Sequence, residues 1–126
     1  MRDLKILIID DQLSHLRIVK KMVERFGWQA CTADSAEVAE LMLEYGHEFC
    51  AIITDLKMPW MSGLEFCQIV KEKYPQIKIY ALSGNLDLFD YDELKNAGFD
   101  GFYFKPITLA TIENLLAAIS SGASEI

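Results

Sequence analysis

The stretch LKILIIDD, residues 4–11, decides the fold, because an apolar run of strand length ends abruptly in the carboxylates Asp10 and Asp11. Residues 49–54 repeat this design and end in Asp55. Nearly continuous apolar runs of this length are typical of strands in a parallel sheet that helices cover on both faces. The two stretches therefore predict neighbouring central strands with acids at their carboxyl ends.

Two further apolar runs end in groups of different chemistry. Residues 77–82 precede Ser83, and residues 101–104 precede Lys105 and Pro106. In an open parallel α/β sheet, ligands bind outside the carboxyl ends of the strands. We therefore expect three carboxylates, one hydroxyl and one ammonium to meet at a single edge of the sheet.

The order of segments along the chain predicts one doubly wound domain. Expected strands at residues 4–9, 28–33, 49–54, 77–82 and 101–104 alternate with expected helices at 12–26, 34–45, 62–73, 87–97 and from 108 onward. This alternation predicts right-handed crossovers and a parallel sheet. The common solution is the flavodoxin-like α/β fold, with strand order 2-1-3-4-5 and a crevice between strands one and three. That crevice would hold Asp10, Asp11 and Asp55.

Capping residues and apolar stripes support the helices. Asp34 with Glu37, and Ser62 with Glu65, have the spacing of a capping box, and Thr108 is expected to cap the last helix. The first and last helices carry apolar residues at spacings of three and four, which predict their buried faces. These residues are Leu16, Val19, Val23 and Phe26 in the first, and Leu109, Ile112, Leu115, Leu116 and Ile119 in the last.

Length and composition limit the class of protein. The 126 residues suit one domain, and 52% hydrophobic with 25% charged residues is ordinary globular usage. A net charge of -7 disfavours direct binding to nucleic acid. The sequence has no apolar run of membrane-spanning length and no recognisable signal peptide, so we expect a cytoplasmic protein. Three cysteines without a C-x-x-C pattern are expected to be reduced core or near-core residues.

Residues 1–120 would form the domain, and residues 121–126 a flexible tail or the start of a linker.

The acids suggest a divalent cation. Three carboxylates in one cleft repel one another unless a cation intervenes, and Mg²⁺ prefers carboxylate, water and phosphate oxygens. Asp11 and Asp55 could ligate the cation directly, and Asp10 could hold a metal-bound water or the partner carboxylate. An isolated Asp-Asp pair more often caps a helix, but Asp55 at the neighbouring strand end favours the metal site.

The remaining groups suit phosphoryl chemistry. A carboxylate such as Asp55 can act as a nucleophile and form an aspartyl phosphate. Lys105 could pair with phosphoryl oxygens and Ser83 could donate a hydrogen bond to them. A Lys-Pro pair after a strand is also common in solvated turns. The charge balance favours the site, because three aspartates, one divalent cation and one lysine sum to zero.

Five stretches of the chain stand out together: IIDD (8–11), TDLKMP (54–59), Gly63, LSG (82–84) and FYFKP (102–106). In this order and spacing, they resemble the receiver domain of bacterial two-component response regulators, and the resemblance covers essentially the whole chain.

The resemblance implies a function and a set of roles. Asp55 would be the phosphoacceptor, and Asp10 and Asp11 would build the Mg²⁺ site with the backbone carbonyl of Lys57 as a further ligand. Lys105 would bind the phosphoryl group, Ser83 would be the switch hydroxyl, and Phe102 would occupy the switch-aromatic position, where many relatives carry Tyr.

The same resemblance implies partners and an output. A histidine kinase or phosphotransfer protein would donate the phosphoryl group, and the face of the fourth helix, fifth strand and fifth helix would change. The domain would not be an enzyme in the ordinary sense, although it would assist its own phosphoryl transfer and a slow hydrolysis of the aspartyl phosphate. A missing effector domain, an unknown downstream protein and a phosphorylation-dependent homodimer remain open.

Three other classes fit less well. A haloacid-dehalogenase-type phosphohydrolase usually carries an acid two residues after its nucleophile, where this chain has Lys57. A flavodoxin-like cofactor binder needs a hydroxyl- and glycine-rich phosphate loop after the first strand, where this chain has two acids. A receiver-like adaptor that acts without phosphorylation is disfavoured by the complete set of acid, hydroxyl and lysine.

A few conspicuous residues fall outside this set. His15 lies one helical turn past Asp11, where we expect a solvated helix residue, with a docking contact as the alternative. Trp60 is expected to be a surface or partly packed ring, and the alternative is that it anchors a partner protein. The fourth helix carries more apolar residues than one core face accommodates, so some are expected on an interaction face: Leu88, Phe89 and Tyr91.

Overall fold

The computed structural model describes residues 5–45, 48–59, 61–84 and 91–121. Strands and helices alternate in the order β1 (Lys5–Ile9), α1 (Leu13–Arg25), β2 (Gln29–Ala33), α2 (Ala36–Glu44), β3 (Ala51–Asp55), α3 (Gly63–Lys73), β4 (Lys78–Ser83), α4 (Tyr91–Ala97), β5 (Gly101–Phe104) and α5 (Leu109–Ser121). The predicted tail begins with a residue that is still helical, Ser121, and the rest of it lies outside the described residues.

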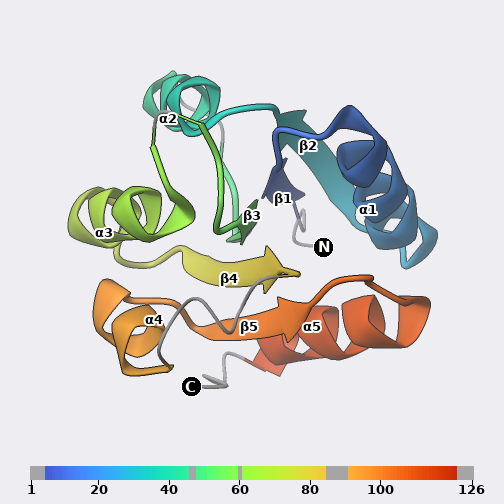
Figure 1. Ribbon diagram of the computed structural model, residues 1–126. Coiled ribbons are helices and arrows are strands. Elements are labelled where there is room, and N and C mark those ends of the chain that lie inside the picture. Colours follow the sequence, from blue (N-terminus) through green and yellow to red (C-terminus); the bar gives the residue numbers. More distant parts are fainter. Residues whose placement is uncertain (1–4, 46–47, 60, 85–90, 122–126) are drawn as a thin grey trace.

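The five strands form one parallel sheet in the order β2-β1-β3-β4-β5, which confirms the predicted topology. Helices α1 and α5 cover one face of this sheet, and α2, α3 and α4 cover the other (Figure 1). All five residues of β3 are buried, as are four of the five in β1, because both strands lie in the middle of the sheet with helices on both sides. The carboxyl ends of β1, β3, β4 and β5 therefore lie along one edge.

Two apolar cores hold the layers together. Under α1 and α5, side chains from alternate positions of β1 and β3 pack on Leu16, Val19 and Val23, and on Ile112, Leu115 and Leu116. Under α2, α3 and α4, the other strand positions pack on Phe66, Cys67, Val70 and Leu94. The prediction that Leu109 belongs to the buried stripe of α5 is wrong, since this residue is 37% exposed at the first turn of that helix.

The helix starts are partly as predicted. Ser62 and Glu65 form the expected capping box at α3, and Thr108 Oγ1 accepts a hydrogen bond from Thr111 N at 3.2 Å. The predicted Asp34 cap is wrong by one residue. Ser35 is the N-cap of α2, and its hydroxyl accepts from Val38 N at 3.1 Å. Asp34 and Ser35 both have side chains that can cap a helix. Glu37 lies three residues after Asp34, as in a capping box, and this spacing favoured Asp34 over Ser35.

An ionic cluster ties the opposite end of the sheet together. Asp100, just before β5, accepts from Lys71 Nζ of α3 and from Ile79 N of β4, both at 2.9 Å. Lys71 Nζ also donates to the carbonyl of Ile77 at 2.7 Å. Because Lys71 and Asp100 are both largely shielded from water, this cluster fixes α3 against β4 and β5 far from the carboxyl edge.

Candidate functional site

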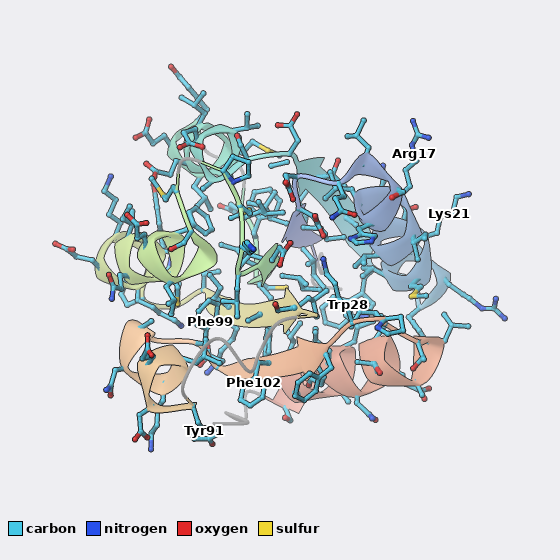
Figure 2. The ribbon with its side chains drawn as sticks, viewed as in Figure 1. Arg17, Lys21, Trp28, Tyr91, Phe99 and Phe102 are labelled. Carbon is cyan, nitrogen blue, oxygen red and sulfur yellow. The ribbon has the colours of Figure 1, made fainter. Side chains whose placement is uncertain are left out.

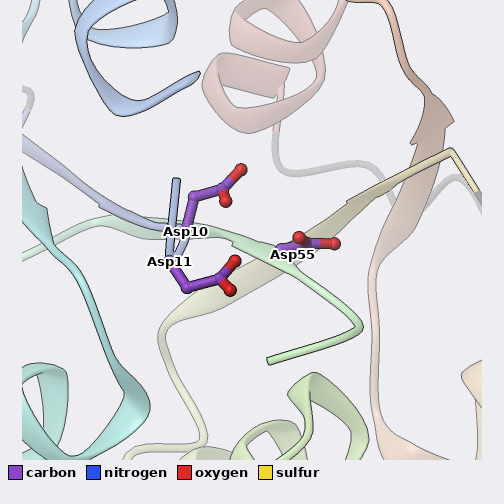
Figure 3. A group of neighbouring side chains, drawn as sticks. All are labelled: Asp10, Asp11 and Asp55. Atoms are coloured by element: carbon purple, nitrogen blue, oxygen red, sulfur yellow. The ribbon is translucent and has the colours of Figure 1, made fainter. Parts of the chain in front are cut away.

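The three predicted acids come together at the carboxyl edge. Asp10 and Asp11 follow β1, and Asp55 ends β3, the strand beside it. Carboxylate oxygens from all three lie within 4.8 Å of one another, and Figure 3 shows the side chains gathered between the ends of the two strands. Asp10 and Asp55 are buried, whereas Asp11 is exposed. The arrangement is one that a hard divalent cation such as Mg²⁺ would fit, because such cations prefer carboxylate oxygens.

Asp10 also supports the start of α1, although it is not the helix cap. Its Oδ1 accepts from Gln12 N at 3.0 Å, and Gln12 itself is the N-cap residue without a side-chain capping bond. The other oxygen, Oδ2, accepts a hydrogen bond from Lys105 Nζ. One carboxylate thus serves both the helix start and the acidic site.

Lys105 connects the acids across the sheet. Its Nζ lies 2.8 Å from Asp10 Oδ2 and 3.4 Å from Asp55 Oδ2, although 50 residues or more separate it from each in sequence. Its backbone N donates to the carbonyl of Ser83 at 3.1 Å, and its side chain is only 18% exposed. The solvated-turn interpretation of Lys105 is therefore wrong.

The environment of Asp55 disfavours its charged form. Burial raises the pKa of this carboxyl above its ordinary value of 3.8, the positive charge of Lys105 lowers it, and the negative charge of Asp10 raises it again. The backbone N of Lys57 donates a weak hydrogen bond to Asp55 Oδ1 at 3.4 Å. A cation placed among these acids would favour ionised Asp55, and so would any further donor.

Gly63 lets helix α3 approach the end of β3. Its N donates to the carbonyl of Leu56 at 2.8 Å. A Cβ atom at this position would lie 2.4 Å from the backbone oxygen of Asp55 and 2.9 Å from Cα of Leu56. Any side chain at residue 63 would therefore push directly on the backbone that carries Asp55.

Ser83 and Phe102 lie on adjacent strands beside this site. Ser83 is buried and follows Leu82, which is the register partner of Asp55. Phe102 is half-buried, and its ring meets that of Tyr91 edge-on with centroids 5.7 Å apart; Figure 2 shows both at the α4 side of β5. Phe104 is 63% exposed and packs edge-on against Phe102 at 6.4 Å. Of the predicted apolar face on the fourth helix, Tyr91 is half-exposed, while Leu88 and Phe89 lie outside the described residues.

Sequence reasoning missed the placement of His15. Its Nδ1 lies 3.1 Å from Lys105 Nζ and 3.3 Å from Asp10 Oδ2, so the prediction of a merely solvated helix residue needs correction. The spacing of His15 from Asp11, one helical turn, was a signal that it faces the same edge. Trp60, the other conspicuous ring near the site, lies outside the described residues.

The site opens into a cleft of about 570 Å³. Two of the three acids, Asp11 and Asp55, line it together with Lys105 and with residues of the loops around them: Gln12, His15, Lys57, Met58, Pro59 and Gly84. A cleft with two carboxylates and an ammonium in its wall suits a small anion bound together with a cation.

The chain belongs to the response regulator receiver domain family, whose model matches residues 6–119. It is therefore a receiver domain of two-component signalling, as the sequence motifs predicted. The chain is 30% identical over 121 residues to chemotaxis protein CheY-3 of Vibrio cholerae, covering 94% of this chain and 92% of that one. It is 29% identical to the peroxide stress-activated histidine kinase mak1 of Schizosaccharomyces pombe, covering 90% of this chain but only 7% of the kinase.

Solved structures agree in fold. Chemotaxis protein CheY4 of Vibrio cholerae has a TM-score of 0.84 at 26% identity, covering 94% of this chain and 99% of that one. A response regulator receiver domain protein from Clostridium thermocellum has a TM-score of 0.83 at 29% identity, covering 94% and 96%. None of the helices in the part of the chain that the structure describes is long and apolar enough to cross a membrane.

Proposed function

We propose that this domain is a phosphorylation-dependent switch that accepts a phosphoryl group on Asp55. The observation that carries the proposal is the convergence of three carboxylates within 4.8 Å with Lys105 Nζ 3.4 Å from Asp55. The donor would be a phosphohistidine of a histidine kinase or phosphotransfer protein. The match to a short part of a histidine kinase supports this class of partner, because receiver domains also occur inside such kinases.

The transfer makes one bond and breaks one. An oxygen of ionised Asp55 forms a bond to phosphorus, while the phosphorus–nitrogen bond to the donor imidazole breaks and its electron pair returns to that nitrogen, which takes up a proton. Lys105 lies close enough to Asp55 for its ammonium to pair, as a point charge, with the oxygens of the transferred phosphoryl group. The domain thus assists its own phosphorylation and, by the same groups, a slow hydrolysis of the aspartyl phosphate.

Asp10, Asp11, Asp55 and the backbone carbonyl of Lys57 are the groups that would hold Mg²⁺. The cation supplies charge neutralisation for the clustered acids and for the phosphoryl oxygens. The exposed carboxylate of Asp11 is the side chain best placed to exchange water for the cation, since Asp10 is already bonded to Gln12 N and Lys105.

Phosphorylation would be read on the face formed by α4, β5 and α5. A phosphate carries a charge of roughly -1.5 to -2 where the carboxylate carried -1, so the site gains negative charge and needs donors. Ser83 would move toward the phosphoryl group and leave space beside β5. Phe102, already half-buried, would complete its burial there, which contributes about 1 kcal/mol toward the switched state. Loss of its edge contact with Tyr91 would change the exposed aromatic surface. A downstream protein, an effector domain or a homodimer could read that surface.

The test is to locate the phosphoryl group. Incubation with acetyl phosphate and Mg²⁺, followed by peptide mass spectrometry, is expected to give an acid-stable, base-labile adduct on Asp55. Asp55→Asn is nearly isosteric and keeps the fold, and it should abolish the adduct. An unchanged yield in that variant would reject the assignment.

A further inference from the structure

The ammonium of Lys105 has a third acceptor besides the two carboxylates. Its Nζ lies 2.8 Å from Asp10 Oδ2, 3.4 Å from Asp55 Oδ2 and 3.1 Å from His15 Nδ1. These acceptors come from the end of β1, the end of β3 and the first turn of α1. An ammonium has three protons to donate, so the three acceptors match its capacity.

The contact between His15 and Lys105 is a hydrogen bond in one histidine tautomer only. A lysine ammonium donates and cannot accept, so Nδ1 must be the acceptor and the ring proton must lie on Nε2. In that tautomer, the 3.3 Å separation between His15 Nδ1 and Asp10 Oδ2 is a distance between two acceptors that share one ammonium. A proton on Nδ1 would instead pair His15 with Asp10.

We propose that His15 is a positioning residue that sets where the Lys105 ammonium lies between Asp10 and Asp55. This inference rests on the proposed function, in which Lys105 meets the phosphoryl oxygens. Without His15, the two carboxylate acceptors remain, and the third proton turns toward water. The ammonium then loses a fixed position in a cleft where the reacting atoms must be held in a defined geometry.

The imidazole is placed to act on Lys105 without being needed for the core. The side chain of His15 is 37% exposed and lines the acidic cleft together with Lys105. Both residues also line a second hollow of about 190 Å³, beside Ile18, Val19, Pro106 and Ile107. The His15–Lys105 pair therefore forms a wall between the two hollows. The one helix-start bond of His15, from its backbone N to the carbonyl of Gln12, is available to any replacement residue.

Two substitutions separate positioning from packing. His15→Leu puts an apolar side chain of moderate size in place of the imidazole and removes the acceptor. His15→Asn is smaller, yet its amide oxygen can reach the place of Nδ1 and accept from Lys105. If His15 acted only by packing, the leucine variant should keep more of the phosphorylation rate of the parent. If His15 positions Lys105, the asparagine variant should keep more of that rate.

The experiment measures the initial rate of Asp55 phosphorylation over a range of acetyl phosphate concentrations. His15→Leu is expected to lower the maximal rate about tenfold, the effect of losing one hydrogen bond to a charged group. His15→Asn should recover most of that rate, and the Mg²⁺ dissociation constant of both variants should stay within about twofold of the parent, because the acids are untouched. A leucine variant as fast as the parent, or an asparagine variant as slow as leucine, would overturn the inference.

A second measurement tests the contact without phosphorylation. The ¹⁵N resonances of the His15 ring are expected to show Nδ1 as the unprotonated nitrogen, and Lys105→Met should shift that resonance. A proton on Nδ1, or a resonance that ignores Lys105→Met, would overturn the inference. If the parent chain takes no phosphoryl group at all, the proposed function fails, while the ring resonances still decide whether His15 holds Lys105.

Discussion

Replacing Gly63 with alanine should disturb the phosphoacceptor strand more than its small size suggests. The added Cβ would lie 2.4 Å from the backbone oxygen of Asp55 and 2.9 Å from Cα of Leu56, against an ordinary contact of 3.4 Å or more. Both opposing atoms belong to the backbone, so no flexible side chain can yield. Either α3 or the end of β3 must retreat by about 1 Å, and the 2.8 Å bond from Gly63 N to Leu56 would be strained.

The magnitude follows from the cost of overpacking. Inserting a methyl group into a well-packed site costs about 1–3 kcal/mol, and a backbone obstacle places Gly63→Ala at the upper end, about 3 kcal/mol. For a chain of 126 residues, this corresponds to a fall of roughly 11 °C in the unfolding midpoint. Urea and thermal unfolding would measure it.

Gly84→Ala is the matched control. It makes the same chemical change in the loop after β4, but a Cβ there would meet nothing within 4 Å. We expect its free energy of unfolding to change by less than about 1 kcal/mol. If Gly63→Ala and Gly84→Ala were equally stable, the close approach of α3 to Asp55 would be refuted.

Three further predictions concern charge. In the presence of a chelator, Asp55→Asn should raise the free energy of unfolding at neutral pH. The folded protein raises the pKa of Asp55 above 3.8, so the parent loses stability as the pH rises through that folded pKa. The gain in the variant should therefore vanish in acid. Asp11→Ala should abolish Mg²⁺ binding measured by calorimetry and with it phosphorylation by acetyl phosphate; unchanged Mg²⁺ affinity would contradict the ligand assignment. Asp100→Asn should lower the free energy of unfolding by about 2 kcal/mol in urea titrations, since it weakens the bonds from Lys71 Nζ and Ile79 N, and an effect below about 0.5 kcal/mol would contradict the role of this cluster.

The sequence was most informative where topology alone dictates position. Near-continuous apolar runs marked β1 and β3 as central strands, and parallel strands that share a sheet must bring their carboxyl ends to one edge. Asp10, Asp55 and Lys105 therefore meet although they are distant in the chain. No detail of side-chain packing was needed to predict this.

Predictions that depended on local choices were less successful. The start of α2 could be capped by Asp34 or Ser35, and only the path of the chain out of β2 selects Ser35. Leu109 follows the apolar spacing of α5, but it is the first residue of that helix and is 37% exposed. The spacing of His15 from Asp11 indicated which edge of the sheet His15 faces, but it did not specify the contact with Lys105, which comes from a distant strand.

Amide-resonance mapping of the parent domain with Mg²⁺, with and without beryllofluoride, would show whether a mimic of the phosphoryl group on Asp55 changes the proposed output face. We expect resonance shifts in the acidic loops together with shifts in α4 and around Phe102 of β5. Ser83→Ala should keep the shifts in the acidic loops and lose those in α4 and β5, and Asp55→Asn should lose both. Shifts confined to the acidic loops in the parent domain would refute the proposed switch, because a charge change at Asp55 would then leave the output face unaltered.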